Sequence, residues 1–307
     1  SGAYFGTSNG EGNYPNAVQN MVNLISLARV DSVTNVNILS MTRLLPEFQL
    51  RTMTDLYGDV PYFQAGLGYL GGIYAPPFDK QSAIYPDMLN ELDQAAAALN
   101  AGSYIPSAAD FAYNGNITQW KKFAYSLMLR LAMRLQKVDP AMAQTYVSKA
   151  FAGGVMTSNA DSYMINYPGG ATQSTNGVAY DLGPSNNLKR GEVLHGNIQW
   201  SNTFINTMKS RNDPRLGQIA SVGQVGVGSG TSIGDTVAAH QVGLPNGLDN
   251  APAGTSVDQY SVMNIFTYQD NPTLILLTYD DVDYFKAAAL ERGWTTGTAT
   301  AVYITRQ

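Results

Sequence analysis

The stretch Tyr57-Gly58-Asp59-Val60-Pro61-Tyr62 decides the fold, because it ends one predicted helix and fixes how the chain leaves it. Residues 32–56, directly before it, carry apolar side chains at helical spacing. Gly58 lies where helices commonly end on a left-handed residue, and Pro61 prevents the helix from restarting. The stretch therefore predicts a helix that stops at Tyr57 and a rigid exit loop after it.

The residues of this exit loop predict an architectural role rather than a catalytic one. Gly58 is expected to have a positive φ, which residues with a Cβ adopt only at a cost. Asp59 is expected to accept backbone N–H groups within its own loop, as short polar side chains in turns commonly do. The structural motif consists of Tyr57, Gly58, Asp59, Pro61 and Tyr62.

Further helices are predicted on both sides of the exit loop, by apolar periodicity and by residues typical of helix ends. Asn116, with Gln119 three residues later, forms a capping-box pattern. Candidate N-cap residues elsewhere are Asp79, Asp139 and Thr278. The predicted helices cover residues 15–28, 79–99, 116–135, 139–153, 201–210 and 278–292.

Long segments without helical periodicity separate these helices, at residues 155–194 and 217–275. The pattern predicts a mainly α fold, with helix hairpins of tetratricopeptide-like type, long irregular loops and little sheet. The 34-residue repeat signature of that class is not met. We interpret residues 1–307 as a single domain.

The composition points to neutral ligands. Charged residues make up 13% of the 307 residues, about half of the ~25% of an average soluble domain, and the net charge is −5. Nucleic acid is therefore a poor candidate partner. A surface poor in charge but rich in Tyr, Asn, Ser and Gly suits uncharged polyols such as sugars, since it offers flat apolar faces beside neutral hydrogen-bonding groups.

Motifs for catalysis, metal binding or cofactor binding are not found in the sequence. There is no cysteine, and the two histidines, His195 and His240, lie near no other ligand type at metal spacing. The acidic cluster of Asp280, Asp281 and Asp283 fits the capping of a helix start. We therefore assign no catalytic residue, no metal site and no cofactor.

Aromatic residues in or beside loops are the remaining candidates for ligand contact. An exposed ring can stack on the apolar face of a sugar while neighbouring amides bind its hydroxyl groups. The candidate ligand-binding residues are Tyr4, Phe5, Tyr163, Tyr167, Tyr180 and Trp200.

Three later segments, taken with the exit loop, carry a family resemblance. Residues 78–99 read FDKQSAIYPDMLNELDQAAAAL, residues 116–134 read NITQWKKFAYSLMLRLAMR, and residues 276–294 read LLTYDDVDYFKAAALERGW. The shorter NDPRL, residues 212–216, adds a minor match. In this order and spacing, the segments resemble the SusD/RagB family of outer-membrane nutrient-binding lipoproteins, closest to its SusD-like branch.

The resemblance implies a protein of a Bacteroidota-type bacterium that is lipid-anchored at the cell surface and acts in glycan uptake. Such a protein captures an oligosaccharide and delivers it to a SusC-like TonB-dependent outer-membrane transporter, without being an enzyme. The anchor cysteine of the family is not in this chain. We expect that an N-terminal lipoprotein signal and a C-terminal part are missing from it.

Two alternatives stay open from the sequence. One is a RagB-like protein that binds peptides, and the other is a helical glycan hydrolase. The matched segments are scaffold motifs, so the resemblance transfers no ligand residue by position. One departure from the family pattern lies at Tyr284-Phe285-Lys286, where a more apolar run is expected.

Overall fold

The computed structural model describes residues 13–105, 107–166, 199–223, 234–247, 259–264 and 273–296. Backbone contacts divide the chain into two compact units. Unit 1 comprises residues 1–164 and 275–307, and unit 2 comprises residues 165–274. The interpretation of the whole chain as one family-level domain stays a prediction.

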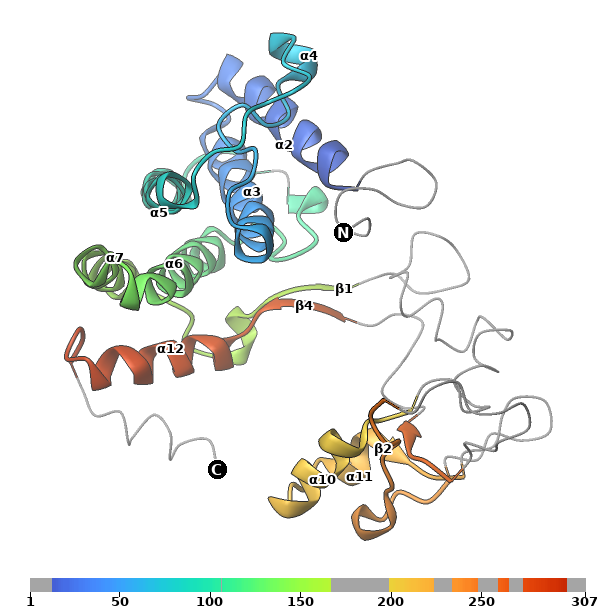
Figure 1. Cartoon of the computed structure of the whole chain (residues 1–307). Coiled ribbons are helices and arrows are strands. Elements are labelled where there is room, and N and C mark those ends of the chain that lie inside the picture. The colour runs from blue at the N-terminus through green and yellow to red at the C-terminus, as the bar shows by residue number, and fades with distance from the viewer. Residues whose placement is uncertain are drawn as a thin grey trace. The chain divides into compact units, whose positions relative to one another are not determined.

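Unit 1 is a scaffold of helices (Figure 1). Its α-helices are α2 (Asn13–Val30), α3 (Val36–Tyr57), α4 (Gly68–Gly71), α5 (Gln81–Ala98), α6 (Ile117–Arg134), α7 (Pro140–Gly153) and α12 (Tyr279–Glu291). Its 3₁₀ helices are η1 (Ser107–Ala109), η2 (Leu135–Lys137) and η3 (Asn159–Asp161).

An apolar core runs through the helices of unit 1. α3 packs against α2 and α5, α6 packs against α5 and α7, and α12 packs against α6. The stripes of α5 and α6 that face this core follow the helical period and are completely buried. They include Leu89, Leu92, Phe123, Leu127 and Leu131. The prediction of a mainly α fold built from helix hairpins with little sheet is confirmed.

Most predicted helix starts are confirmed by hydrogen bonds. Asp139 accepts the N–H of Met142 at the start of α7, and Thr278 and Asp281 form the complete capping box of α12. At the start of α6, Asn116 accepts the N–H of Gln119 at 3.2 Å. The other half of that predicted box is not formed.

Asp79 is not the N-cap of α5, which corrects the sequence-based prediction. Lys80 occupies that position and makes no capping bond with its side chain. The carboxylate of Asp79 instead accepts N–H groups from the exit loop, across a separation that apolar periodicity does not reveal.

Short strands pair segments that lie far apart in the sequence. β1 (Tyr163–Asn166) pairs with β4 (Thr273–Leu277), directly before α12. In unit 2, β2 (Ala220–Ser221) pairs antiparallel with β3 (Val262–Met263), so that Ala220 faces Met263. Neither pair was predicted, because each strand is too short to show an alternating pattern.

Unit 2 has a small core of its own. It contains α10 (Asn202–Ser210), α11 (Leu216–Ile219) and η4 (Ala238–His240) beside the β2–β3 pair. The core residues are Ile205, Met208, Leu216 and Ala220. Trp200 and Phe204 are partly buried against them.

Candidate functional site

The exit loop is fixed to the start of α5 by a reciprocal exchange of side-chain bonds. The Asp59 carboxylate accepts the N–H of Gln81 at 3.0 Å, and the Asp79 carboxylate accepts the N–H groups of Tyr62 and Phe63 at 2.9 and 3.0 Å. Val60 and Asp79 also form an antiparallel bridge. The two ends of the segment between them are therefore held side by side at the start of α5.

Gly58 has the positive φ that the sequence predicts, at 76°. Its N–H bonds to the carbonyl of Thr54, and its own carbonyl accepts the Thr54 hydroxyl at 2.6 Å. The prediction that Asp59 accepts backbone N–H groups within its own loop is wrong. That carboxylate reaches Gln81 and Lys80 instead, and the Lys80 ammonium holds the pKa of Asp59 below its usual range.

The segment between the exit loop and α5 forms one wall of a surface groove, and α2 forms the other. The groove encloses about 580 Å³. This aromatic groove is lined by Val18, Gln19, Pro61, Ala65, Gly66, Gly68, Tyr69, Ile73, Tyr74, Pro76 and Phe78.

Two glycines hold this segment close to its neighbours. Gly66 has a φ of 75°, and a Cβ there would lie 3.1 Å from the Val18 carbonyl oxygen on α2. A Cβ on Gly68 would lie 3.3 Å from the ring of Tyr74. Glycine at these two positions therefore lets the loop approach α2 closely and lets the Tyr74 ring lie beside α4.

Three aromatic side chains of the groove are strongly exposed. The exposed fractions are 79% for Tyr69, 86% for Tyr74 and 70% for Phe78. None of the described residues that line the groove is charged. A concave, neutral surface with free ring faces is suited to ligands that combine apolar faces with hydroxyl groups.

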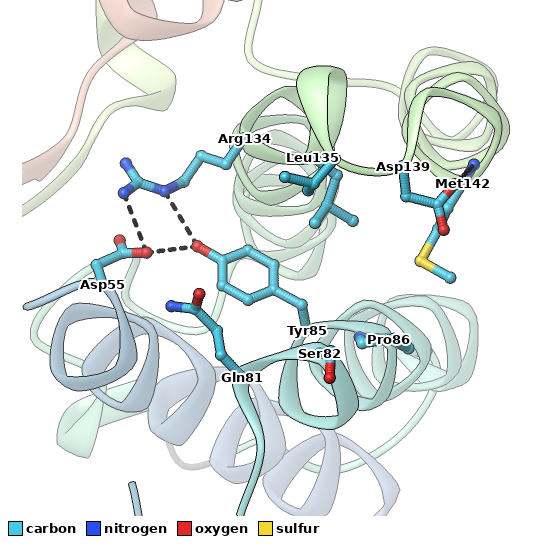
Figure 2. Close-up of a pocket in the computed structure, with 10 residues that line it drawn as sticks. Asp55, Gln81, Ser82, Tyr85, Pro86, Arg134, Leu135, Asp139 and Met142 are labelled. Carbon is cyan, nitrogen blue, oxygen red and sulfur yellow. Dashed lines mark hydrogen bonds and ion pairs between the residues drawn. The ribbon is translucent and has the colours of Figure 1, made fainter. Parts of the chain in front are cut away.

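A second concavity, of about 530 Å³, lies between α3, α5, η2 and α7. Figure 2 shows Asp55, Tyr85 and Arg134 together in it, linked by hydrogen bonds and an ion pair. Arg134 bonds to the Tyr85 hydroxyl at 3.0 Å and to Asp55 at 3.0 Å, and Tyr85 donates to Asp55 at 2.5 Å. Burial and the bond to Asp55 raise the pKa of Tyr85 to about 12.

The polar groups of this pocket serve first to join the helices. Asp55 also pairs with Arg51 at 3.0 Å, and the side chains of both residues are close to fully buried. One carboxylate thus holds two guanidinium groups and a phenol, which tie α3 to α5 and α6. A buried carboxylate shared by side chains from several helices is typical of a structural network.

A third polar cluster lies behind the exit loop. The Tyr62 hydroxyl donates to Asp87 at 2.9 Å and lies 3.3 Å from Glu47, which is only 5% exposed. Burial, together with the negative charges of Glu91 and Asp87, raises the pKa of Glu47 to about 8. Arg43 pairs with Glu91 at 2.7 Å. Across the described residues, no group of acidic or histidine side chains is placed to hold a metal ion.

Two of the six predicted ligand-binding aromatics, Tyr163 and Trp200, lie within the described residues. Tyr163 is buried, and its ring lies 4.2 Å from that of Phe123 and also contacts Trp120, so it packs in the core and has no free face for a ligand. Trp200 is stacked on Phe204 and donates to the Ile219 carbonyl. Tyr4, Phe5, Tyr167 and Tyr180 lie outside the described residues.

Sequence reasoning missed Tyr69, Tyr74 and Phe78, which it treated as part of a loop. A signal was nevertheless present. Residues 60–78 contain no charged side chain, and these three rings are spaced among glycines and prolines. A charge-free, Gly- and Pro-rich loop with several aromatics is unusual on a protein surface unless it contacts something.

Residues 4–305 match the sequence model of a SusD-like family, whose description is "Starch-binding associating with outer membrane". The chain belongs to the SusD-like family. This confirms the resemblance carried by the exit loop and the three segments after it. No match was found among curated proteins.

Solved structures of SusD-like proteins share the fold. A chitin-binding protein is 27% identical with a TM-score of 0.74, over 96% of this chain and 59% of its own. A SusD-like protein from Bacteroidetes is 25% identical with a TM-score of 0.76, over 94% of this chain and 63% of its own. A chitin-binding SusD homolog from Flavobacterium johnsoniae, 24% identical, has a TM-score of 0.70, over 97% of this chain and 57% of its own.

The SusD-like chain therefore spans about three fifths of the length of these relatives. None of the helices in the described ranges is long and apolar enough to cross a membrane.

Proposed function

We propose that this SusD-like protein captures an oligosaccharide at the outer membrane and delivers it to a SusC-like TonB-dependent transporter. The observation that carries the proposal is the match of residues 4–305 to a family of outer-membrane-associated starch-binding proteins. The similarity to a chitin-binding protein supports a polysaccharide-derived ligand.

The chemistry of the surface agrees with an uncharged ligand. Charged residues are scarce over the whole chain, at 13%. The exposed rings of the aromatic groove add apolar faces that stack on sugars. The loop aromatics Tyr4, Phe5, Tyr167, Tyr180 and Trp200 remain proposed ligand contacts.

The protein acts by binding rather than by turnover. Glycoside hydrolysis requires two carboxylates on either side of the scissile bond. Several carboxylates of unit 1 are instead engaged within the fold. Asp110 accepts three backbone N–H groups and the indole N–H of Trp120, and Asp55 joins three helices.

Isothermal titration calorimetry with chitohexaose and maltoheptaose tests this proposal. We expect saturable binding of at least one oligosaccharide, with no release of new reducing ends on prolonged incubation. Release of reducing ends would show that the protein is a glycan hydrolase, which contradicts the proposal. Binding of an oligopeptide mixture, with neither sugar bound, would favour a peptide-binding role.

Delivery and location need separate measurements. We expect the protein, anchored by lipid at the cell surface, to be accessible to antibody on intact cells. It should also co-purify with a TonB-dependent transporter from detergent-solubilised outer membranes. An exclusively periplasmic location would contradict this part of the proposal.

A further inference from the structure

We propose that the aromatic groove between α2 and the segment 61–78 binds a pyranose ring of the oligosaccharide, held by stacking on Tyr69 and Tyr74. The inference rests on the proposed function and adds a site to it. Both side chains lie in unit 1, within the described residues.

The exposed rings are the first argument. Tyr69, Tyr74 and Phe78 are between 70% and 86% exposed although they line a concave surface of about 580 Å³. Exposing three large rings in one place leaves a sizeable apolar area in water, which monomeric proteins usually avoid outside binding sites. The volume lies within the range of roughly 300–1,000 Å³ that is typical of small-ligand pockets.

The chemistry of the lining selects the class of ligand. No described lining residue is charged, so the groove offers nothing to compensate a charged ligand for its lost hydration. The phenol groups of Tyr69 and Tyr74 and the amide of Gln19 supply neutral donors and acceptors. A pyranose has apolar C–H faces for the rings and hydroxyl groups at its edge for these polar groups.

The groove is also held rigid before any ligand arrives. Asp79 fixes the N–H groups of Tyr62 and Phe63, and Gly66 packs on the backbone of α2. The middle of the segment is held as the single turn of α4, where the N–H of Gly71 bonds to the Leu67 carbonyl and the N–H of Gly72 bonds to the Gly68 carbonyl. Binding to a rigid site loses less conformational entropy than binding to a mobile loop.

A rigid concave site fits a sugar better than a protein partner. Standard protein interfaces cover about 800 Å² on each side and are largely flat, with the core of the contact closely packed. The aromatic groove instead gathers its exposed rings around a concave space of about 580 Å³.

Calorimetry of matched variants with chitohexaose and maltoheptaose tests the inference. Tyr69→Ala and Tyr74→Ala should each weaken binding of the oligosaccharide that the wild type binds by about tenfold or more, as loss of a stacked ring does. Tyr69→Phe and Tyr74→Phe keep the stacking face and should stay within a few-fold of wild type. Tyr104→Ala removes a tyrosine that is 62% exposed and lies outside the groove; it is the control and should bind normally.

The outcomes separate the inference from the function on which it rests. If the wild type binds a sugar and both groove variants bind it equally well, the groove assignment is wrong and the proposed function stands. If the wild type binds neither sugar, both proposals fail for these glycans. If the variants keep their sugar affinity but no longer co-purify with the transporter, the groove is a protein-docking surface and the inference is overturned.

Discussion

Asp59 and Asp79 each bond, through their carboxylates, to the backbone of the segment that contains the other. Asp59, in the exit loop, accepts the first N–H of α5 at Gln81, while Asp79, before α5, accepts two N–H groups of the exit loop. The chain between them forms a loop of 19 residues, 60–78, whose two ends are held together by these bonds and by the bridge between Val60 and Asp79. The base of the aromatic groove therefore depends on this exchange.

Removal of the Asp79 carboxylate should destabilise the protein. In Asp79→Ala, the N–H groups of Tyr62 and Phe63 lose their acceptor, at a cost of about 1–3 kcal/mol in the free energy of unfolding. Asp79→Asn keeps an oxygen in the same place and should lose less. Urea denaturation of the two variants checks this, and equal stability of Asp79→Ala and wild type would contradict the structural role.

Substitution of Gly58 should cost stability through backbone strain alone. A Cβ at this position meets no atom within 4 Å, but φ is 76°. Gly58→Ala should therefore lose about 1 kcal/mol or more. Gly102→Ala, where no positive φ is found and the nearest atom lies at 3.4 Å, is the control and should change the melting temperature little. Matching melting temperatures for both variants would refute the strained conformation.

The buried Glu47 should make stability fall as the pH rises. Its pKa in the folded protein is about 8, against an ordinary value of 4.5, because of burial and the charges of Glu91 and Asp87. Between these pH values the folded state holds a proton that the unfolded state releases. The free energy of unfolding should thus decrease by up to roughly 1.4 kcal/mol per pH unit across this window, and level off above it.

Glu47→Gln isolates this effect. The amide cannot ionise and keeps the size of the side chain beside the Tyr62 hydroxyl, so the stability of this variant should depend less on pH and should exceed that of wild type above about pH 8. Glu291→Gln, on the exposed part of α12, is the control and should follow the wild-type curve. Parallel curves for Glu47→Gln and wild type would show that Glu47 does not titrate in this window.

Local features of the fold were predictable from the sequence because they depend on neighbouring residues. Gly58 ends α3, Asp139 caps α7, and Thr278 with Asp281 caps α12, each through bonds that span a few positions. Features that depend on distant residues were not predictable. Tyr62, which bonds to Asp79, lies 17 residues away from it, and β1 pairs with β4 across nearly the whole of unit 2 in sequence.

The candidate site shows the same division. Tyr163 was predicted to contact ligand because it lies beside a long loop, but its ring packs against those of Tyr113, Trp120 and Phe123. Burial of an aromatic depends on which helices pack around it, and the sequence of the loop alone does not contain that information. The exposure of Tyr69 likewise depends on how the loop 60–78 folds.

Loss of the Asp55 carboxylate should destabilise the helical scaffold strongly. Asp55 is shared by Arg51, Arg134 and Tyr85, and the side chains of Asp55 and Arg51 are about nine-tenths buried. Asp55→Ala leaves buried positive charge without its counter-ion, which typically costs about 3–5 kcal/mol. Asp93→Ala removes a more exposed ion pair with Lys149 and serves as control. Chemical denaturation should show a large loss only for Asp55→Ala.

Oligosaccharide affinity should hardly depend on salt. The described lining of the aromatic groove contains no charged residue, so a neutral sugar bound there forms no ion pair that salt could screen. Raising the ionic strength from about 0.1 M to about 1 M shortens the Debye length from about 10 Å to about 3 Å. Calorimetry at both ionic strengths should give dissociation constants within a factor of about two, because only exposed charge pairs respond to this change. A tenfold loss of affinity in high salt would instead place charged groups in the binding site, and would direct the search to a pocket that contains them, such as the one formed by Asp55, Arg134 and Asp139.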